Sequence, residues 1–413
     1  MASLADNVRE RVEQALRSQE GAIFALPALV GRSSYTGRDV LAPNSRLAPP
    51  YQDERGYVRV EWWIMSLTRA ANDLPRQDEG VTRLLLPGGD PVLLTQAARS
   101  AGDLLFGRYQ ARWPLTKVLD IGGEPVLPDF GPFGGRGSEA EVPPIPFHVH
   151  SGVVVDGRLR GPGKLEAYFF PPVDVPPYNR QLGRVITRLG VRPGVTFDQV
   201  LAATREFGVS DAMYALGNVF EVRPYDGWTI RPGTLHAPGP APTFEIQLPQ
   251  DDYHYVAWRL GTRLAPSERE HHRRQSLLRG FHDEAQLLRQ AVDWEVSTAP
   301  DFEARHRRKP VLLEEGRWGR RLRIFFDEFY GEALEIRPGQ RYRWPATDRP
   351  RAGIVWSGEG TLNGPAHRIA AAGDGAPAEF LIAPGHEGIF TNEGTTDLLV
   401  YTVFPMEGEA VPR

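Results

Sequence analysis

Short runs of strand-forming residues, separated by turns rich in glycine and proline, recur along most of this chain. The 413 residues include 43 glycines and 37 prolines, which is more than an average globular protein contains. Glycine permits tight turns and proline cannot donate to a sheet ladder, so these residues end a strand after a few positions. These frequent turns between short strand-like runs predict a mainly β protein, and the length predicts two or three domains.

The strand-like runs fall into two regions. The first region holds runs at 57–65, 113–119, 147–155, 164–170, 220–222, 228–230 and 243–248. In the second, runs at 323–330, 331–339, 352–364, 378–385 and 397–404 follow at short spacing with turn signals between them. Such spacing is typical of an antiparallel sandwich or barrel. We therefore predict two β-barrels.

Helices are predicted before, within and between these regions. Leu4, Val8, Val12 and Leu16 recur every four residues, as in an amphipathic helix. Further helical patterns cover 93–107, 179–216 (with a capping box that begins at Thr196) and the charged segment 266–306, whose two adjacent histidines are expected to face solvent. The predicted domains are an N-terminal helical segment (1–45), a first β domain (46–265) with a helical insertion at about 176–217, a helical connector (266–306) and a second β domain (307–413).

Composition excludes several classes of function. There are 48 basic and 52 acidic side chains, so no basic excess points to nucleic acid or to an anionic membrane. The absence of cysteine excludes disulfides, cysteine-ligated zinc and thiol catalysis. No apolar run reaches the roughly 18 residues that a membrane span requires, and residues 1–20 lack the apolar stretch of a signal peptide. We expect a cytoplasmic protein, either monomeric or homodimeric.

Two histidines, His148 and His150, are spaced to share one face of a strand. Residues i and i+2 of a strand point in the same direction, so both imidazoles can meet one ion without a bend in the backbone. Two surface histidines on an edge strand would show the same pattern. The spacing alone leaves both interpretations open.

Five further side chains could join them inside a barrel. Lys164 and Glu166 share the polar face of a strand whose other face is apolar, as expected either of a barrel interior or of a solvent-facing strand. His236 follows a Pro-Gly turn that fixes the start of the next strand, although backbone hydrogen bonds could equally satisfy it. Glu245 and Gln247 alternate with apolar residues, so they face either a cavity or the solvent.

The order of these motifs resembles the cupin superfamily and, more narrowly, class I mannose-6-phosphate isomerase. The motifs are HVH (148–150), GKLE (163–166), PGTLHA (232–237) and FEIQ (244–247), preceded by EWWIMS (61–66), LLFG (104–107) and WPLTKVLD (113–120). The resemblance covers most of 55–260 and, loosely, 321–405. It implies two cupin-type jelly-roll barrels, of which the first binds a metal ion and the second does not.

The resemblance implies that His148, His150, Glu166 and His236 hold one divalent metal ion, with zinc first and manganese, iron or nickel as alternatives. His148 stands where the family has glutamine, which gives the set of three histidines and one glutamate that is widespread in other cupins. Neutral imidazoles suit all these metals. In the second barrel, Gly388 stands where the corresponding turn of the first has its histidine.

The resemblance also implies an aldose–ketose isomerase that acts on a small sugar or sugar phosphate through an enediol. Glu245 would be the base, Lys164 would orient or protonate the oxygens, and His254 is a further acid/base candidate. We expect Glu245 and Lys164 to pair across the cavity, which would keep Glu245 ionised. The family's arginine is replaced here by Tyr255, and Arg259, four residues on, could take its role.

Two alternatives follow from the departures from the family pattern. The loss of the family's arginine is also compatible with a cupin that binds metal and a sugar without turnover. The third histidine ligand is compatible with an iron-dependent cupin oxygenase.

Overall fold

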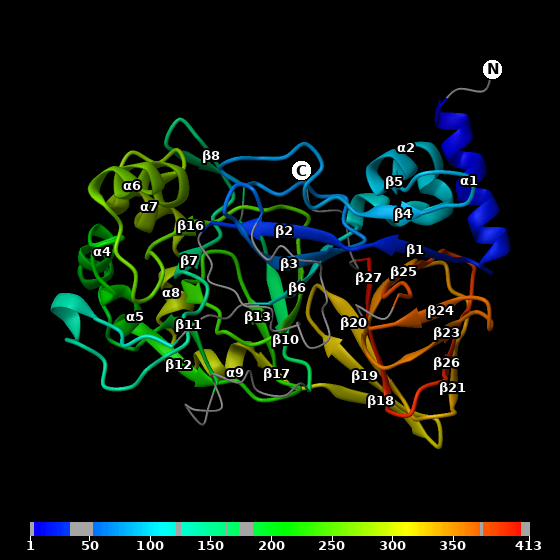
Figure 1. The fold of residues 1–413 in the computed structure, drawn as a ribbon. Coiled ribbons are helices and arrows are strands. Elements are labelled where there is room, and N and C mark those ends of the chain that lie inside the picture. The colour runs from blue at the N-terminus through cyan, green and yellow to red at the C-terminus, as the bar shows by residue number, and fades with distance from the viewer. Residues whose placement is uncertain are drawn as a thin grey trace.

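The computed structural model describes residues 4–33, 53–120, 125–161, 163–172, 185–371 and 375–405. They form antiparallel sheets grouped into two β-barrels, with helices clustered at the outer end of the first barrel and beside the second (Figure 1). The predicted mainly β fold with two barrels, helical insertion and helical connecting segment is confirmed.

The first barrel packs a seven-stranded sheet against a five-stranded sheet. The seven-stranded sheet has the order β17 (Arg307–Arg308), β13 (Gly227–Ile230), β10 (Glu166–Phe169), β15 (Thr243–Gln247), β6 (Leu115–Leu119), β3 (Val58–Ile64), β2 (Ala28–Arg32). The five-stranded sheet has the order β12 (Gly217–Glu221), β11 (Ile186–Val191), β14 (His236–Ala237), β7 (His148–Val149), β16 (His254–Tyr255). A separate hairpin consists of β8 (Val153–Val155) and β9 (Arg158–Arg160).

The second barrel packs a nine-stranded sheet against a four-stranded sheet. The nine-stranded sheet has the order β18 (Val311–Gly316), β19 (Gly319–Phe325), β20 (Tyr330–Ile336), β27 (Leu398–Phe404), β22 (Arg351–Ser357), β25 (Glu379–Ile382), β1 (Ala22–Leu26), β4 (Arg83–Leu85), β5 (Val92–Leu93). The four-stranded sheet has the order β21 (Arg341–Trp344), β26 (Gly388–Asn392), β23 (Glu359–Leu362), β24 (Arg368–Ala370). Apolar side chains such as Leu334, Trp344 and Phe390 fill the space between these sheets.

The helices lie outside the barrels. They are α1 (Leu4–Ser18), α2 (Leu94–Leu105), η1 (Gly107–Arg112), η2 (Gly131–Phe133), α4 (Phe197–Arg205), α5 (Ala212–Leu216), α6 (Pro266–His272), the π-helical η3 (Arg273–Leu278), α7 (Glu284–Ala291), α8 (Trp294–Ser297) and α9 (Phe302–His306). The capping box at Thr196 is confirmed, since its side chain and that of Gln199 each accept from the other's backbone. Among the described helices, none combines the length and apolar composition needed to span a bilayer.

The helical prediction over 179–216 is wrong for residues 186–191, which form β11. Thr187, Leu189 and Val191 are buried there, and β-branched residues favour an extended backbone. Pairing with β12 on one side and β14 on the other decides the conformation. Residues 179–184 of the predicted helical region lie outside the described residues.

Residues 22–32 form two strands that the sequence analysis did not predict. Pro27 separates them, because it has no N–H to donate to a ladder. β1 pairs with β25 of the second barrel, whereas β2 pairs with β3 of the first. This segment therefore ties the two barrels together, and the predicted domain boundaries stay predictions.

A buried carboxylate also joins the barrels. Glu379 on β25 accepts hydrogen bonds from the Trp62 indole (2.8 Å) and the Met65 backbone amide (2.5 Å), at the end of β3. Its side chain is fully buried, and the Thr82 hydroxyl lies 3.3 Å from it. Burial raises the pKa of Glu379 to about 8, although the hydrogen bonds favour the ionised form.

We expect Glu379→Gln to change how stability depends on pH, because glutamine keeps the shape but does not titrate. The pKa of Glu379 is raised in the folded state, so its contribution to stability is fully present below the unfolded value of 4.5 and lost as pH rises through about 8. The Tm of the wild type, measured by thermal denaturation, should therefore fall relative to that of the variant between these pH values. A difference in Tm that is constant with pH would contradict this prediction.

Candidate metal centre

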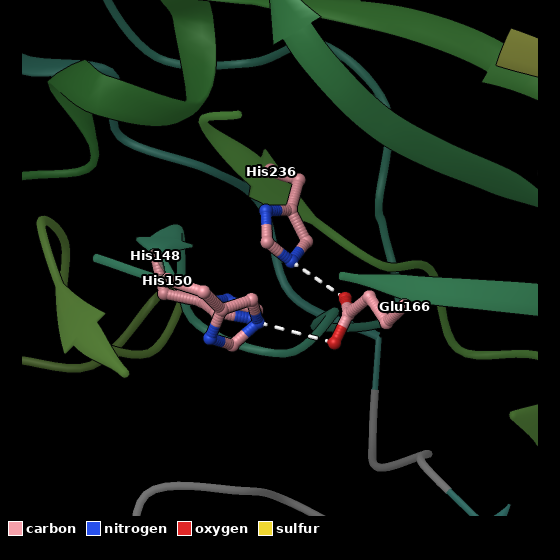
Figure 2. Close-up of side chains that lie close together, drawn as sticks. All are labelled: His148, His150, Glu166 and His236. Atoms are coloured by element: carbon pink, nitrogen blue, oxygen red, sulfur yellow. Dashed lines mark hydrogen bonds and ion pairs between the residues drawn. The ribbon is translucent and has the colours of Figure 1, made fainter. Parts of the chain in front are cut away.

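Four side chains converge between the two sheets of the first barrel (Figure 2). His148 on β7 pairs directly with His236 on β14, and His150 follows just after β7. Glu166 reaches them from β10 in the opposite sheet. All four are buried, and one ligand atom from each lies within 4.8 Å of the others. The structure thus brings together the four residues that the sequence analysis predicted as metal ligands.

Backbone carbonyls fix the tautomer of the three histidines. Each Nδ1 atom lies close to a carbonyl oxygen: His148 with Pro146 (2.7 Å), His150 with Asp252 (2.5 Å) and His236 with Thr234 (2.8 Å). A carbonyl oxygen can only accept, so each Nδ1 must donate its hydrogen. In a neutral imidazole this leaves a bare lone pair on Nε2, the state required of a metal ligand.

The lone pairs of two histidines face the Glu166 carboxylate. The Nε2 atom of His150 lies 3.2 Å from one carboxylate oxygen, and that of His236 lies 3.0 Å from the other. The Nε2 atom of His150 is buried and has no hydrogen-bond partner in the described structure. Acceptors that face one another without a proton between them are unfavourable in a buried site. A cation among them would satisfy them all.

Burial keeps His148 and His150 neutral. It lowers the pKa of His148 well below 6.5 and that of His150 to about 4. For Glu166, burial acts to raise the pKa, but opposing effects led by the positive charge of Lys164 outweigh it and hold the pKa well below its usual range. Neutral imidazoles beside an ionised carboxylate form a donor set that fits one divalent cation.

A cavity beside His148, His150 and Glu166 is lined by further ionisable residues, which are Arg32, Glu61, Lys117, Lys164, Tyr168, Glu245, Asp251 and Tyr253. Arg32 binds the carboxylates of Glu61 (2.7 Å) and Asp251 (3.0 Å). The Nζ atom of Lys117 lies 3.5 Å from Glu61 and 3.9 Å from Asp251. The sequence analysis assigned no role to these four residues. Glu61 and Lys117 belong to the EWWIMS and WPLTKVLD segments, whose resemblance to the isomerase family could have indicated a place in the site.

Glu245 and Lys164 face this cavity, as predicted. The register of β10 and β15 places Glu245 and Gln247 on the face that carries Glu166. The closest partners of Lys164 are Gln247 (2.7 Å) and Glu166 (2.9 Å). The nearest carboxylate oxygen of Glu245 lies 3.9 Å from the Nζ atoms of both Lys164 and Lys117. Glu245 therefore lies between two ammonium groups without a close pair to either.

The expectation that Lys164 keeps Glu245 fully ionised is wrong. Burial raises the pKa of Glu245 to about 7, with Lys117 opposing the shift and Glu166 adding to it. The Oε1 atom of Glu245 is buried and has no hydrogen-bond partner in the described structure. A carboxylate with a free oxygen and a pKa near 7 can take up and release a proton at neutral pH.

The sequence matches no family model and no curated protein. Solved structures, in contrast, match the fold over nearly its full length. The mannose 6-phosphate isomerase from Bacillus subtilis aligns with a TM-score of 0.58 at 16% identity, over 92% of this chain and 99% of that chain. A variant of phosphomannose isomerase from Salmonella typhimurium aligns with 0.57 at 12%, over 93% and 100%. A mannose 6-phosphate isomerase bound with zinc and yttrium aligns with 0.57 at 11%, over 93% and 99%.

This chain has the mannose-6-phosphate isomerase fold. At such low identities the likeness establishes the architecture alone. The chemistry rests on the residues that the mannose-6-phosphate isomerase fold places around the cavity of this particular chain.

Two of the predicted catalytic residues lie away from the four ligands. The register of β16 with β7 sets Tyr255 opposite His148 and turns His254 toward the other face, where its Nδ1 contacts the carbonyl of Leu277 (2.8 Å). Arg259 does not line the cavity. Their positions do not support catalytic roles for His254 and Arg259, and neither residue enters the function proposed below.

We expect the four-ligand site to keep its cation at a pH where ordinary histidine sites lose theirs. Because burial lowers the pKa of His150 to about 4, protons compete for its Nε2 only near that pH. The difference in bound zinc between the wild type and His150→Ala, measured by elemental analysis, should persist as pH falls through 6.5 and vanish toward about 4. Loss of the difference around pH 6.5 would contradict this prediction.

Proposed function

We propose that this chain is a metal-dependent aldose–ketose isomerase, which moves a proton between adjacent carbons of a small sugar or sugar phosphate through an enediol. The observation that carries the proposal is the position of Glu245. Glu245 lines the same cavity as His148, His150 and Glu166, and its buried Oε1 atom has no hydrogen-bond partner in the described structure. A base whose oxygen is not already hydrogen-bonded, beside a cation site, is what this reaction requires.

We infer that His148, His150, Glu166 and His236 hold one divalent cation, with zinc first. A solved protein of this fold is bound with zinc, and imidazole with carboxylate also suits manganese, iron or nickel. When bound, the cation would act as a Lewis acid that polarises the carbonyl and hydroxyl oxygens of an open-chain sugar and stabilises the negative charge of the enediolate.

Glu245 has the properties of the base that carries the proton. It takes the hydrogen from one carbon as a proton, and the electron pair of that C–H bond forms the enediolate. It then returns the proton to the neighbouring carbon, while the hydroxyl proton passes from one sugar oxygen to the other and the carbonyl moves to the adjacent carbon. A pKa of about 7 suits both steps, because the same group must accept and donate at neutral pH.

Lys164 acts as a hydrogen-bond donor to the sugar oxygens in this scheme. Burial acts to lower its pKa, but Glu166, Glu245 and Asp251 outweigh that effect and hold the pKa above its ordinary value. Lys164 therefore stays protonated and orients oxygens rather than removing protons. Lys117, held by Glu61 and Asp251, offers a second ammonium group beside Glu245.

Glu245→Gln is expected to lower turnover by about 10²–10⁴ and to leave the metal content unchanged, since the base is lost but no ligand is. Turnover and metal stoichiometry should be measured on the same preparation. In the wild type, kcat should fall as pH drops below about 7, because protonated Glu245 cannot accept the proton.

Glu379→Gln is the matched control, because it makes the same exchange at a buried carboxylate outside the cavity. It should retain turnover. Full activity in metal-replete Glu245→Gln would remove Glu245 from the mechanism. A loss of bound metal in Glu245→Gln, by roughly 10–100-fold in affinity, would instead assign it to the support of a ligand.

Isotope exchange tests the reaction itself. Conversion of an aldose or ketose in deuterated water should place deuterium at C1 or C2 of the product, across a panel of free sugars and their phosphates. Thermal stabilisation by a sugar without exchange would favour a binding protein without turnover. Oxygen consumption that requires Fe(II) would favour an oxygenase.

A further inference from the structure

A second group of metal-ligating side chains lies outside the cavity. Asp73 belongs to the loop that follows β3, and His271 and His272 stand at the end of α6. One ligand atom from each lies within 4.8 Å of the other two. Two ligand atoms on one tetrahedral zinc-like ion are about 3.4 Å apart, so side-chain rotations that move each atom by about 0.7 Å would close the group on an ion.

His271 is exposed, as the sequence suggested, whereas His272 is not fully solvated. His272 is half-buried, its ring centroid lies 4.4 Å from that of Trp258, and its Nδ1 atom is buried without a hydrogen-bond partner in the described structure. Burial also lowers the pKa of His272, which favours the neutral imidazole. The helix therefore presents a desolvated, unsatisfied ring nitrogen.

The two histidines approach Asp73 as separate donors. Neighbouring residues of an α-helix point about 100° apart, and α6 passes into the π-helical η3 immediately after His272. The two rings accordingly lie nearly perpendicular, at 77°, with centroids 5.1 Å apart. Within the part of the chain that the structure describes, Asp73 and His271 make no hydrogen bond or ion pair that would satisfy them otherwise.

We propose that Asp73, His271 and His272 bind a second divalent cation, of the class that includes zinc, cobalt and nickel. Two imidazole nitrogens and one carboxylate oxygen suit this class, and three protein ligands leave at least one position for water. The site is distinct from the four-ligand centre and does not depend on the isomerase proposal.

The second cation would link helix α6 to one wall of the cavity. The residues next to Asp73 hold the ion pair between Arg32 and Asp251: the Ala71 amide donates to Asp251 (2.8 Å), and the Asn72 side chain accepts from Arg32 (3.0 Å). A cation on Asp73 would therefore fix the loop that positions this pair. Its role is structural, as a clip between the connector and the first barrel.

Zinc stoichiometry tests the proposal on the full chain. By equilibrium dialysis and elemental analysis, the wild type should bind two equivalents of zinc, whereas His272→Ala and Asp73→Asn should each bind one. His150→Ala should also bind one, because only the four-ligand site is lost. His282→Ala is the matched control, since His282 is an exposed histidine of the same connector, and it should keep both equivalents.

Cobalt gives a readout that separates ligation from folding. In the His150→Ala background, Co²⁺ should produce visible absorption bands that disappear when Asp73→Asn is added, while the circular dichroism and metal-free Tm stay unchanged. One equivalent in the wild type that vanishes with His150→Ala would overturn the proposal. Two equivalents that survive both His272→Ala and Asp73→Asn would overturn it as well.

Discussion

The contact between the Glu166 carboxylate and the bare Nε2 atoms of two histidines governs the whole first barrel. A buried carboxylate is costly unless it is paired, and acceptors facing it add to that cost. Lys164 supplies one partner at 2.9 Å, and the Tyr168 hydroxyl donates to the other carboxylate oxygen. The remaining lone pairs, with every Nδ1 committed to a backbone carbonyl, are left for a cation. The ligands come from both sheets of the first barrel, so the site exists only when the two sheets are packed together.

The cavity extends this arrangement as a network of alternating charges. Arg32 lies between two carboxylates, and Lys117 lies among three, at distances of 3.5–3.9 Å. Carboxylates close to these cations have lowered pKa values, as seen for Glu61 and Asp251. Glu245 is equally buried but keeps its neighbours at 3.9 Å, so burial dominates and its pKa rises. Groups of one chemical type thus acquire different protonation behaviour within one cavity.

The second barrel is joined to the first through the N-terminal part of the chain. Its nine-stranded sheet incorporates β1, β4 and β5, all of which come from the N-terminal part of the chain. Glu379 on β25 also accepts hydrogen bonds from Trp62 and Met65. These bonds attach β3, the strand that carries Glu61, to the second barrel. One strand that lines the cavity is thus hydrogen-bonded at its end to the other barrel.

The sequence by itself determined which side chains share a face. The two-residue period of a strand placed His148 with His150 and Glu245 with Gln247, and the Pro-Gly turn located His236, because these relations are local to the backbone. Only the tertiary structure brought Arg32 to Asp251, 219 residues away, and turned His254 away from the cavity. It also made residues 186–191 a strand by pairing them on both sides, and it raised the pKa of Glu245 by burial. Strand partners and burial depend on segments far apart in the chain, which no local pattern records.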